Sequence, residues 1–113
     1  MKIGRVSEET GLSIDTIRYY EKQGFVKKPD KDTSGHRSYT AQDVDLLNWV
    51  VCMKNSGMSL NRIKAYTEAF YQGDREVCIA FLEEHLARLN EQKRNTEHYI
   101  QVTENKLNRF KAS

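Results

Sequence analysis

The last third of this chain contains neither glycine nor proline from Asp74 to Ser113. Those are the two residues that most readily end a helix, so about 39 residues can run as one helix roughly 58 Å long. A helix of that length cannot be buried within one small domain. The 113 residues therefore leave room for a single compact domain before this helix, and a large two-lobed enzyme is excluded.

Mostly apolar residues recur along this stretch in alternating steps of four and three, and we call this row of residues the seam. They are Leu82, Leu86, Leu89, Lys93, Thr96, Ile100, Thr103, Leu107 and Phe110. This heptad pattern predicts that residues 73–113 form a dimerisation helix whose partner is a second copy of the chain. The polar members of the seam weaken a long parallel zipper, so we expect an antiparallel coiled coil. A helix that folds back over its own domain is the alternative.

Glycine and hydroxyl residues divide the preceding part of the chain into short helices. The first helix ends at Gly11, and the second, from Ile14 to Gln23, is capped by Ser13 and ends at Gly24. Two helices joined by a tight turn that contains glycine predict a helix-turn-helix.

Residues 25–39 show no helical periodicity. They contain the only proline, Pro29, together with Gly35 and several turn-forming polar residues between apolar or aromatic ends. This composition predicts a small β-hairpin, or wing. Basic and aromatic side chains crowd it: Lys27, Lys28, Lys31, His36, Arg37 and Tyr39.

Two more helices follow the wing. Thr40 begins a third helix that runs to Gly57, and Ser59 caps a fourth that ends at Gly73. The predicted fold is therefore mainly α: a winged helix-turn-helix domain over residues 1–72, followed by the dimerisation helix.

The second helix carries chemistry suited to nucleic acid on one face. Helical spacing groups four residues there, Asp15, Arg18, Tyr19 and Lys22, and turns Ile14 and Ile17 towards the core. Arginine can bind guanine or phosphate, and tyrosine can donate to phosphate. Ser13 and Thr16 add hydroxyls near the start of the helix. The alternative is an ordinary solvated helix face.

Charge is concentrated in the same part of the chain. The net charge is only +2, but residues 1–40 hold eight Lys or Arg against six Asp or Glu, whereas the rest balances at ten against ten. The basic excess therefore coincides with the predicted helix-turn-helix and wing.

Residues 1–72 strongly resemble the MerR family of bacterial regulators. The motifs that carry the resemblance are Ile3-Gly4-Arg5-Val6, Thr10-Gly11-Leu12-Ser13, Thr16-Ile17-Arg18-Tyr19-Tyr20-Glu21, Gly24-Phe25-Val26, Gly35-His36-Arg37-Ser38-Tyr39 and Asp43-Val44. The resemblance implies that a homodimer binds a near-palindromic operator in double-stranded promoter DNA and distorts it so that RNA polymerase can use the promoter.

The resemblance also implies which residues contact DNA. We expect these to be Arg18 and Tyr19 on the recognition helix and Arg37 and Tyr39 in the wing. Together with the hydroxyls at the helix start and the neighbouring tyrosine, the complete set is Ser13, Thr16, Arg18, Tyr19, Tyr20, Arg37 and Tyr39.

The two cysteines, Cys52 and Cys78, lie far apart and have no zinc-ligand spacing. We therefore expect no metal site and no cofactor. The resemblance places an effector site after the dimerisation helix, where this sequence has no further residues, so we also expect no separate effector domain. Cys52 falls in a stretch, 49–54, that resembles short members of the family responding to aldehydes or nitric oxide, which implies a sensing thiol. The alternative is a small packed side chain.

No catalytic arrangement can be singled out, so an enzyme is not expected, and no apolar run is long enough for a membrane span. The sequence predicts a cytoplasmic transcription regulator that senses electrophilic or nitrosative stress through Cys52. Two other functions share some of these features: an effector-independent DNA-binding or architectural protein, and a coiled-coil adaptor that binds protein alone.

Overall fold

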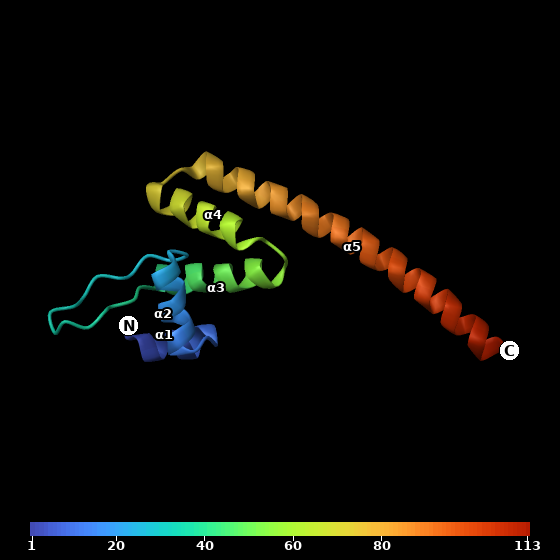
Figure 1. Ribbon diagram of the computed structural model, residues 1–113, viewed down its shortest axis with the longest axis horizontal. Helices are drawn as coiled ribbons and strands as arrows, with labels where there is room; N and C mark the ends of the chain where they lie inside the picture. Colours follow the sequence, from blue (N-terminus) through green and yellow to red (C-terminus); the bar gives the residue numbers. More distant parts are fainter. The chain divides into compact units, whose positions relative to one another are not determined.

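The computed structural model describes residues 1–113. It contains the helices α1 (Ile3–Thr10), α2 (Ile14–Gln23), α3 (Ala41–Asn55), α4 (Leu60–Gln72) and α5 (Arg75–Ala112) (Figure 1). The chain divides into two compact units, Met1–Cys78 and Ile79–Ser113. The first turn of α5 therefore groups with the N-terminal unit, a little beyond the boundary at residues 72 and 73 that the sequence predicts.

The predicted capping residues form the helix ends. The Ser13 hydroxyl accepts a hydrogen bond from the Thr16 amide, 3.1 Å away. Thr40 and Asp43 form a reciprocal capping box at the start of α3. Gly24 ends α2 at φ 81°, in the left-handed region that glycine adopts without steric cost. Local sequence therefore sets where α2 begins and ends.

The core of the N-terminal unit lies where α1, α2, α3 and α4 meet. Val6, Ile17 and Ile63 are fully buried, and Leu47 is 1% exposed. Helix α1 packs against both α2 and α3, and α3 packs against α4. Figure 1 shows α3 and α4 running side by side. One apolar cluster thus holds the helix-turn-helix on a third and fourth helix.

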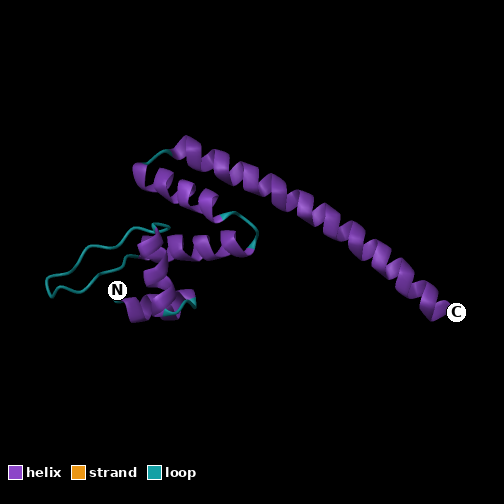
Figure 2. Cartoon of the chain, in the orientation of Figure 1, coloured by secondary structure: helices purple, strands orange, loops and turns teal.

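The predicted β-wing contains no strand. Residues 25–39, which we call the wing, form a loop with a single antiparallel bridge between Lys31 and Arg37 (Figure 2). The tip is held instead by Asp32, whose carboxylate accepts hydrogen bonds from the amides of Ser34 and His36 at 2.9 and 3.0 Å. A side chain that satisfies the turn amides takes the place of a strand ladder.

Helix α5 is continuous over 38 residues. Most apolar residues of the predicted seam are exposed on it, including Leu86 at 58% and Phe110 at 71%. The sequence prediction of a long uninterrupted helix is confirmed. None of the helices combines the length and the apolarity that crossing a membrane requires.

A buried carboxylate on α2 ties the wing to the recognition helix. The Glu21 side chain is 1% exposed. One oxygen accepts a hydrogen bond from the Tyr39 hydroxyl at 2.5 Å, and the other forms an ion pair with the Arg37 guanidinium at 3.0 Å. Burial, and then the bond to Glu21, raise the pKa of Tyr39 well above its usual value, so its phenol remains a donor at neutral pH.

Removing the Tyr39 hydroxyl should destabilise the N-terminal unit. Tyr39→Phe leaves one buried oxygen of the Glu21 carboxylate without its donor, so we expect the free energy of unfolding to fall by about 1.5–3 kcal/mol. Urea denaturation at one fixed protein concentration measures the change. Tyr99→Phe is the matched control, because Tyr99 is 62% exposed on α5. Equal midpoints for the two variants would show that this network contributes nothing.

Candidate nucleic-acid interface

Helix α2 has an outward polar face and an inward apolar face. The four residues assigned to the outward face are all exposed: Asp15, Arg18, Tyr19 and Lys22. The inward face is formed by Ile17, Tyr20 and Glu21. The expectation that Ile14 also faces the core is wrong, because this residue in the first turn of the helix is 36% exposed. The exposed face is free to enter a groove of DNA.

The start of α2 presents two hydroxyls. The Ser13 and Thr16 oxygens lie 2.8 Å apart, and Ser13 also caps the helix. Ser13 is exposed and Thr16 is half-buried. The first amides of a helix favour an anion, so this end of α2 is suited to a phosphate.

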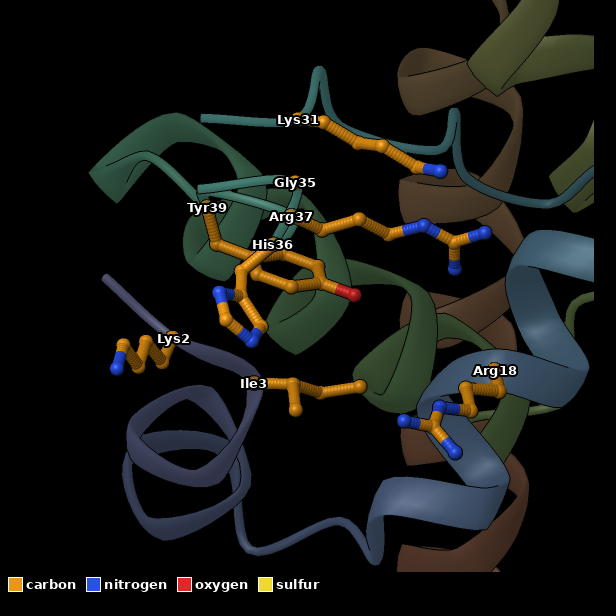
Figure 3. A pocket seen from close by; sticks show the side chains of 8 residues that line it. All are labelled: Lys2, Ile3, Arg18, Lys31, Gly35, His36, Arg37 and Tyr39. Carbon is orange, nitrogen blue, oxygen red and sulfur yellow. The ribbon is translucent and has the colours of Figure 1, made fainter. Parts of the chain in front are cut away.

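A cleft of about 460 Å³ lies between the start of α1, the exposed face of α2 and the wing. Figure 3 shows Arg18 reaching it from α2, and Lys31 and Arg37 reaching it from the wing. The residues that line it are Lys2, Ile3, Arg18, Lys31, Gly35, His36, Arg37 and Tyr39. No acidic side chain is among them, so the charge of the cleft favours an anion.

Arg37 is held by an ion pair but stays partly exposed to solvent. Its guanidinium forms an ion pair with Glu21, yet its side chain remains 34% exposed. A guanidinium has five N–H donors, and this ion pair uses one of them. The Glu21 carboxylate therefore fixes the direction of Arg37, while other donors are available to a phosphate in the cleft.

Two of the residues expected to contact DNA, Tyr20 and Tyr39, are buried in the structure. Tyr20 is 5% exposed, and its ring packs edge-on against Phe25 at 5.9 Å between ring centroids. Tyr39 is 3% exposed and donates its hydroxyl to Glu21. The Tyr39 hydroxyl is already bonded to Glu21, and a DNA contact by either residue stays a prediction. Both side chains position the neighbours that are exposed.

Two further residues of this site were not expected from the sequence. Lys2 lines the cleft although it precedes the first helix. Glu21 follows Ile17 by four positions and so lies on the buried face of α2. A carboxylate at a core position requires a buried partner. The four-residue spacing from Ile17 therefore indicates in the sequence that Glu21 is buried and paired.

Cys52 is exposed on α3. Two residues further along the same helix, the Lys54 ammonium lies 5.9 Å from the centre of the Tyr20 ring on α2. Cys78 is half-buried; burial, and then the Asp74 carboxylate, raise the pKa of its thiol, which lowers its thiolate fraction at neutral pH. No group of three or more His, Cys, Asp or Glu side chains is placed to hold a metal ion.

Curated relatives of this chain are transcriptional regulators. It is 32% identical to an uncharacterised helix-turn-helix-type transcriptional regulator of Haemophilus influenzae, over 91% of this chain and 78% of that one. It is 36% identical to the helix-turn-helix-type transcriptional regulator AdhR of Bacillus subtilis, over 68% of this chain. The match spans only 55% of AdhR.

Solved structures share the fold. A MerR family transcriptional regulator from Bacillus thuringiensis superposes with a TM-score of 0.78 at 26% identity, over 95% of this chain and 96% of that one. HiNmlR, a MerR family regulator lacking the sensor domain and bound to promoter DNA, gives 0.75 at 29% identity, over 89% and 78%.

The family assignment comes from the N-terminal part of the sequence. Residues 1–69 match the family described as MerR HTH family regulatory protein. That segment holds α1 to α3, the wing and nearly all of α4, and therefore the whole basic cleft. This chain belongs to the MerR helix-turn-helix family of regulatory proteins.

Proposed function

We propose that this protein is a transcription regulator that binds double-stranded promoter DNA as a homodimer. The observation that carries the proposal is the basic cleft, because it combines the exposed Arg18 of α2 with the fixed Arg37 of the wing. The likeness to HiNmlR, whose structure contains promoter DNA, supports it. A coiled-coil adaptor that binds only protein would have no use for this cleft.

In this proposal the two arginines have different tasks. The exposed face of α2 enters the major groove, where Arg18 reads a base edge and Tyr19 lies beside the sugar-phosphate backbone. The cleft receives the backbone, with Arg37 held in place by Glu21 and with the start of α2 near Ser13 and Thr16 offering amides to phosphate. One half-site is thus bound by two linked elements.

The second half-site requires a second copy. The exposed seam of α5 supplies a surface for a homodimer. Two N-terminal units then bind a near-palindromic operator and distort the DNA. Distortion of promoter DNA in turn sets how RNA polymerase engages the same promoter. An effector-independent DNA-binding or architectural protein would bind similarly but would show no response to a signal.

We further propose that Cys52 senses electrophilic or nitrosative stress. Its thiol is exposed, and it lies on the same helix as Lys54. The Lys54 ammonium contacts the ring of Tyr20 on the buried face of α2. Modification of Cys52 that shifts the end of α3 would be transmitted to α2 through this contact. Cys78 is the less reactive thiol because burial raises its pKa.

Replacing the arginines of the cleft should have separable effects. Arg18→Ala should lower operator affinity by about 1–3 kcal/mol and relax the preference at one base position. Arg37→Ala should weaken all sites similarly and reduce the slope of log affinity against log salt by about one. Mobility shifts over a salt series measure both. Arg88→Ala on α5 is the control, and equal losses for all three variants would contradict this docking arrangement.

Disrupting the seam should separate the two copies. Leu86→Glu with Leu107→Glu places charges on the exposed seam of α5, so the protein should sediment as a monomer at micromolar concentration. Operator affinity should then fall by roughly 10²-fold or more, because the second half-site is no longer tethered. Gln101→Glu is the control for an added charge. A monomeric wild type would refute the dimer.

Cys52→Ser should leave operator affinity nearly unchanged while abolishing induction by aldehydes or nitric oxide donors in cells. The reason is that modification of Cys52 is expected to shift the bound promoter between two distorted states while the affinity for the operator stays nearly the same. Cys78→Ser is the matched control and should induce normally. Full induction of the Cys52 variant, or an unmodified Cys52 by mass spectrometry under inducing conditions, would assign it a packing role only.

A further inference from the structure

Asp15 is the acidic side chain on the outward face of α2. It lies in the first turn of the helix, on the same face as Arg18 and Tyr19, and it is exposed. Its carboxylate forms no hydrogen bond and no ion pair within the chain, and neither does the Arg18 guanidinium one turn further along. Both charged groups are therefore available to whatever this face of α2 binds.

We propose that Asp15 selects a cytosine in the operator, on the base pair next to the one that Arg18 reads. The Asp15 carboxylate accepts a hydrogen bond from the N4 amino group of that cytosine in the major groove. The proposal rests on the proposed function, because it concerns the same DNA-binding face. It adds the identity of one base of each half-site and the physical reason for that preference.

The position of Asp15 along α2 suits a contact with a base. In a helix-turn-helix, the N-terminal residues of the second helix are the ones that contact base edges in the major groove. Of the first four residues of α2, Ile14 to Ile17, only Asp15 is charged. Its side chain is short, so its carboxylate contacts groups that lie directly beneath the helix rather than phosphates at the rim of the groove.

The spacing of Asp15 and Arg18 matches the spacing of base pairs. The two residues are three positions apart, which is about 4.5 Å along the axis of an α-helix. Successive bases along one strand of B-DNA are separated by about 3.4 Å. Two side chains one helical turn apart on the same face therefore contact adjacent base pairs.

The charge of Asp15 opposes binding to DNA in general. The cleft beside it already supplies attraction to phosphates that does not depend on sequence, through Lys2, Arg18, Lys31 and Arg37. A carboxylate on the same surface weakens that attraction at every site, and only a hydrogen-bond donor on a base edge offsets the loss. Asp15 therefore discriminates mainly by weakening binding to sites that carry the wrong base.

Cytosine is the base that suits an ionised carboxylate, which can only accept hydrogen bonds. Guanine presents the acceptors N7 and O6 in the major groove, and thymine presents the acceptor O4, so both repel it. Adenine presents an amino donor at N6 but carries the acceptor N7 beside it. Cytosine presents its N4 amino donor without an acceptor on its own groove edge. The pattern of donors and acceptors therefore selects cytosine.

The alternative role for Asp15 is confined to the helix. An acidic residue in the first turn stabilises a helix through its interaction with the positive end of the helix dipole. This effect is the same for every DNA sequence, so it changes stability and overall affinity but produces no base preference. The measurement that separates the two roles is therefore base selection.

Selection of the full-length protein against a pool of random duplexes tests the proposal. The wild type should enrich half-sites with a cytosine next to the base pair whose preference is lost in Arg18→Ala. Asp15→Asn should change that cytosine to adenine, because a side-chain amide both donates and accepts and so pairs with adenine N6 and N7. Asparagine has nearly the same size as aspartate, and the urea midpoint of the variant checks that the fold is kept.

Affinity measurements give the size of the effect. Asp15→Ala should reduce the ratio of operator affinity to random-duplex affinity by roughly 5- to 150-fold, while its affinity for random duplex rises. Glu8→Gln is the matched control, because it also removes one exposed carboxylate from the N-terminal unit, and Glu8 lies on α1 outside the basic cleft. This control should leave the base preference at every position unchanged.

Each contrary outcome overturns a different statement. An unchanged base preference in Asp15→Asn, with a normal urea midpoint, refutes the contact with cytosine. An equal rise in the affinity of Asp15→Ala for operator and random duplex leaves Asp15 only its role at the helix end. A change at a base pair that does not adjoin the one read by Arg18 refutes the proposed spacing. Failure of the wild type to enrich any sequence refutes the proposed function itself.

Discussion

The buried carboxylate of Glu21 is the interaction on which the DNA-binding face depends. It lies on the inner side of the recognition helix and receives both the Tyr39 hydroxyl and the Arg37 guanidinium from the base of the wing. A carboxylate with 1% exposure is costly unless both oxygens have donors. The cost of leaving it unpaired therefore holds the wing in one place relative to α2, although the wing contains only one β-bridge.

Most of the fold could be predicted from local chemistry. Glycines and capping residues mark most ends of α1 to α4, and the missing glycine and proline predict α5, because these features act within a few residues of their own position. The wing was predicted only as a hairpin. Its actual form depends on the Asp32 side chain satisfying turn amides, a competition with strand pairing that composition does not resolve.

The site was predicted less completely than the fold. Arg18 and Tyr19 follow from helical spacing, and they are exposed as expected. The family resemblance implies DNA contacts for Tyr20 and Tyr39, but it does not reveal that Tyr20 packs against Phe25 and that Tyr39 bonds to Glu21. Lys2 joins the cleft only through the tertiary fold. Contacts between distant segments are what a single sequence does not supply.

The division of α2 into two faces has a consequence for how such a regulator changes over evolutionary time. Asp15, Arg18, Tyr19 and Lys22 are exposed, whereas Ile17 and Glu21 are held in the interior. Substitutions on the outer face leave the core unaltered, so a duplicated gene can acquire a new operator without first losing its fold. Substitutions that change the target sequence therefore cost little fold stability, whereas substitutions at the inner face destabilise the fold and are removed by selection.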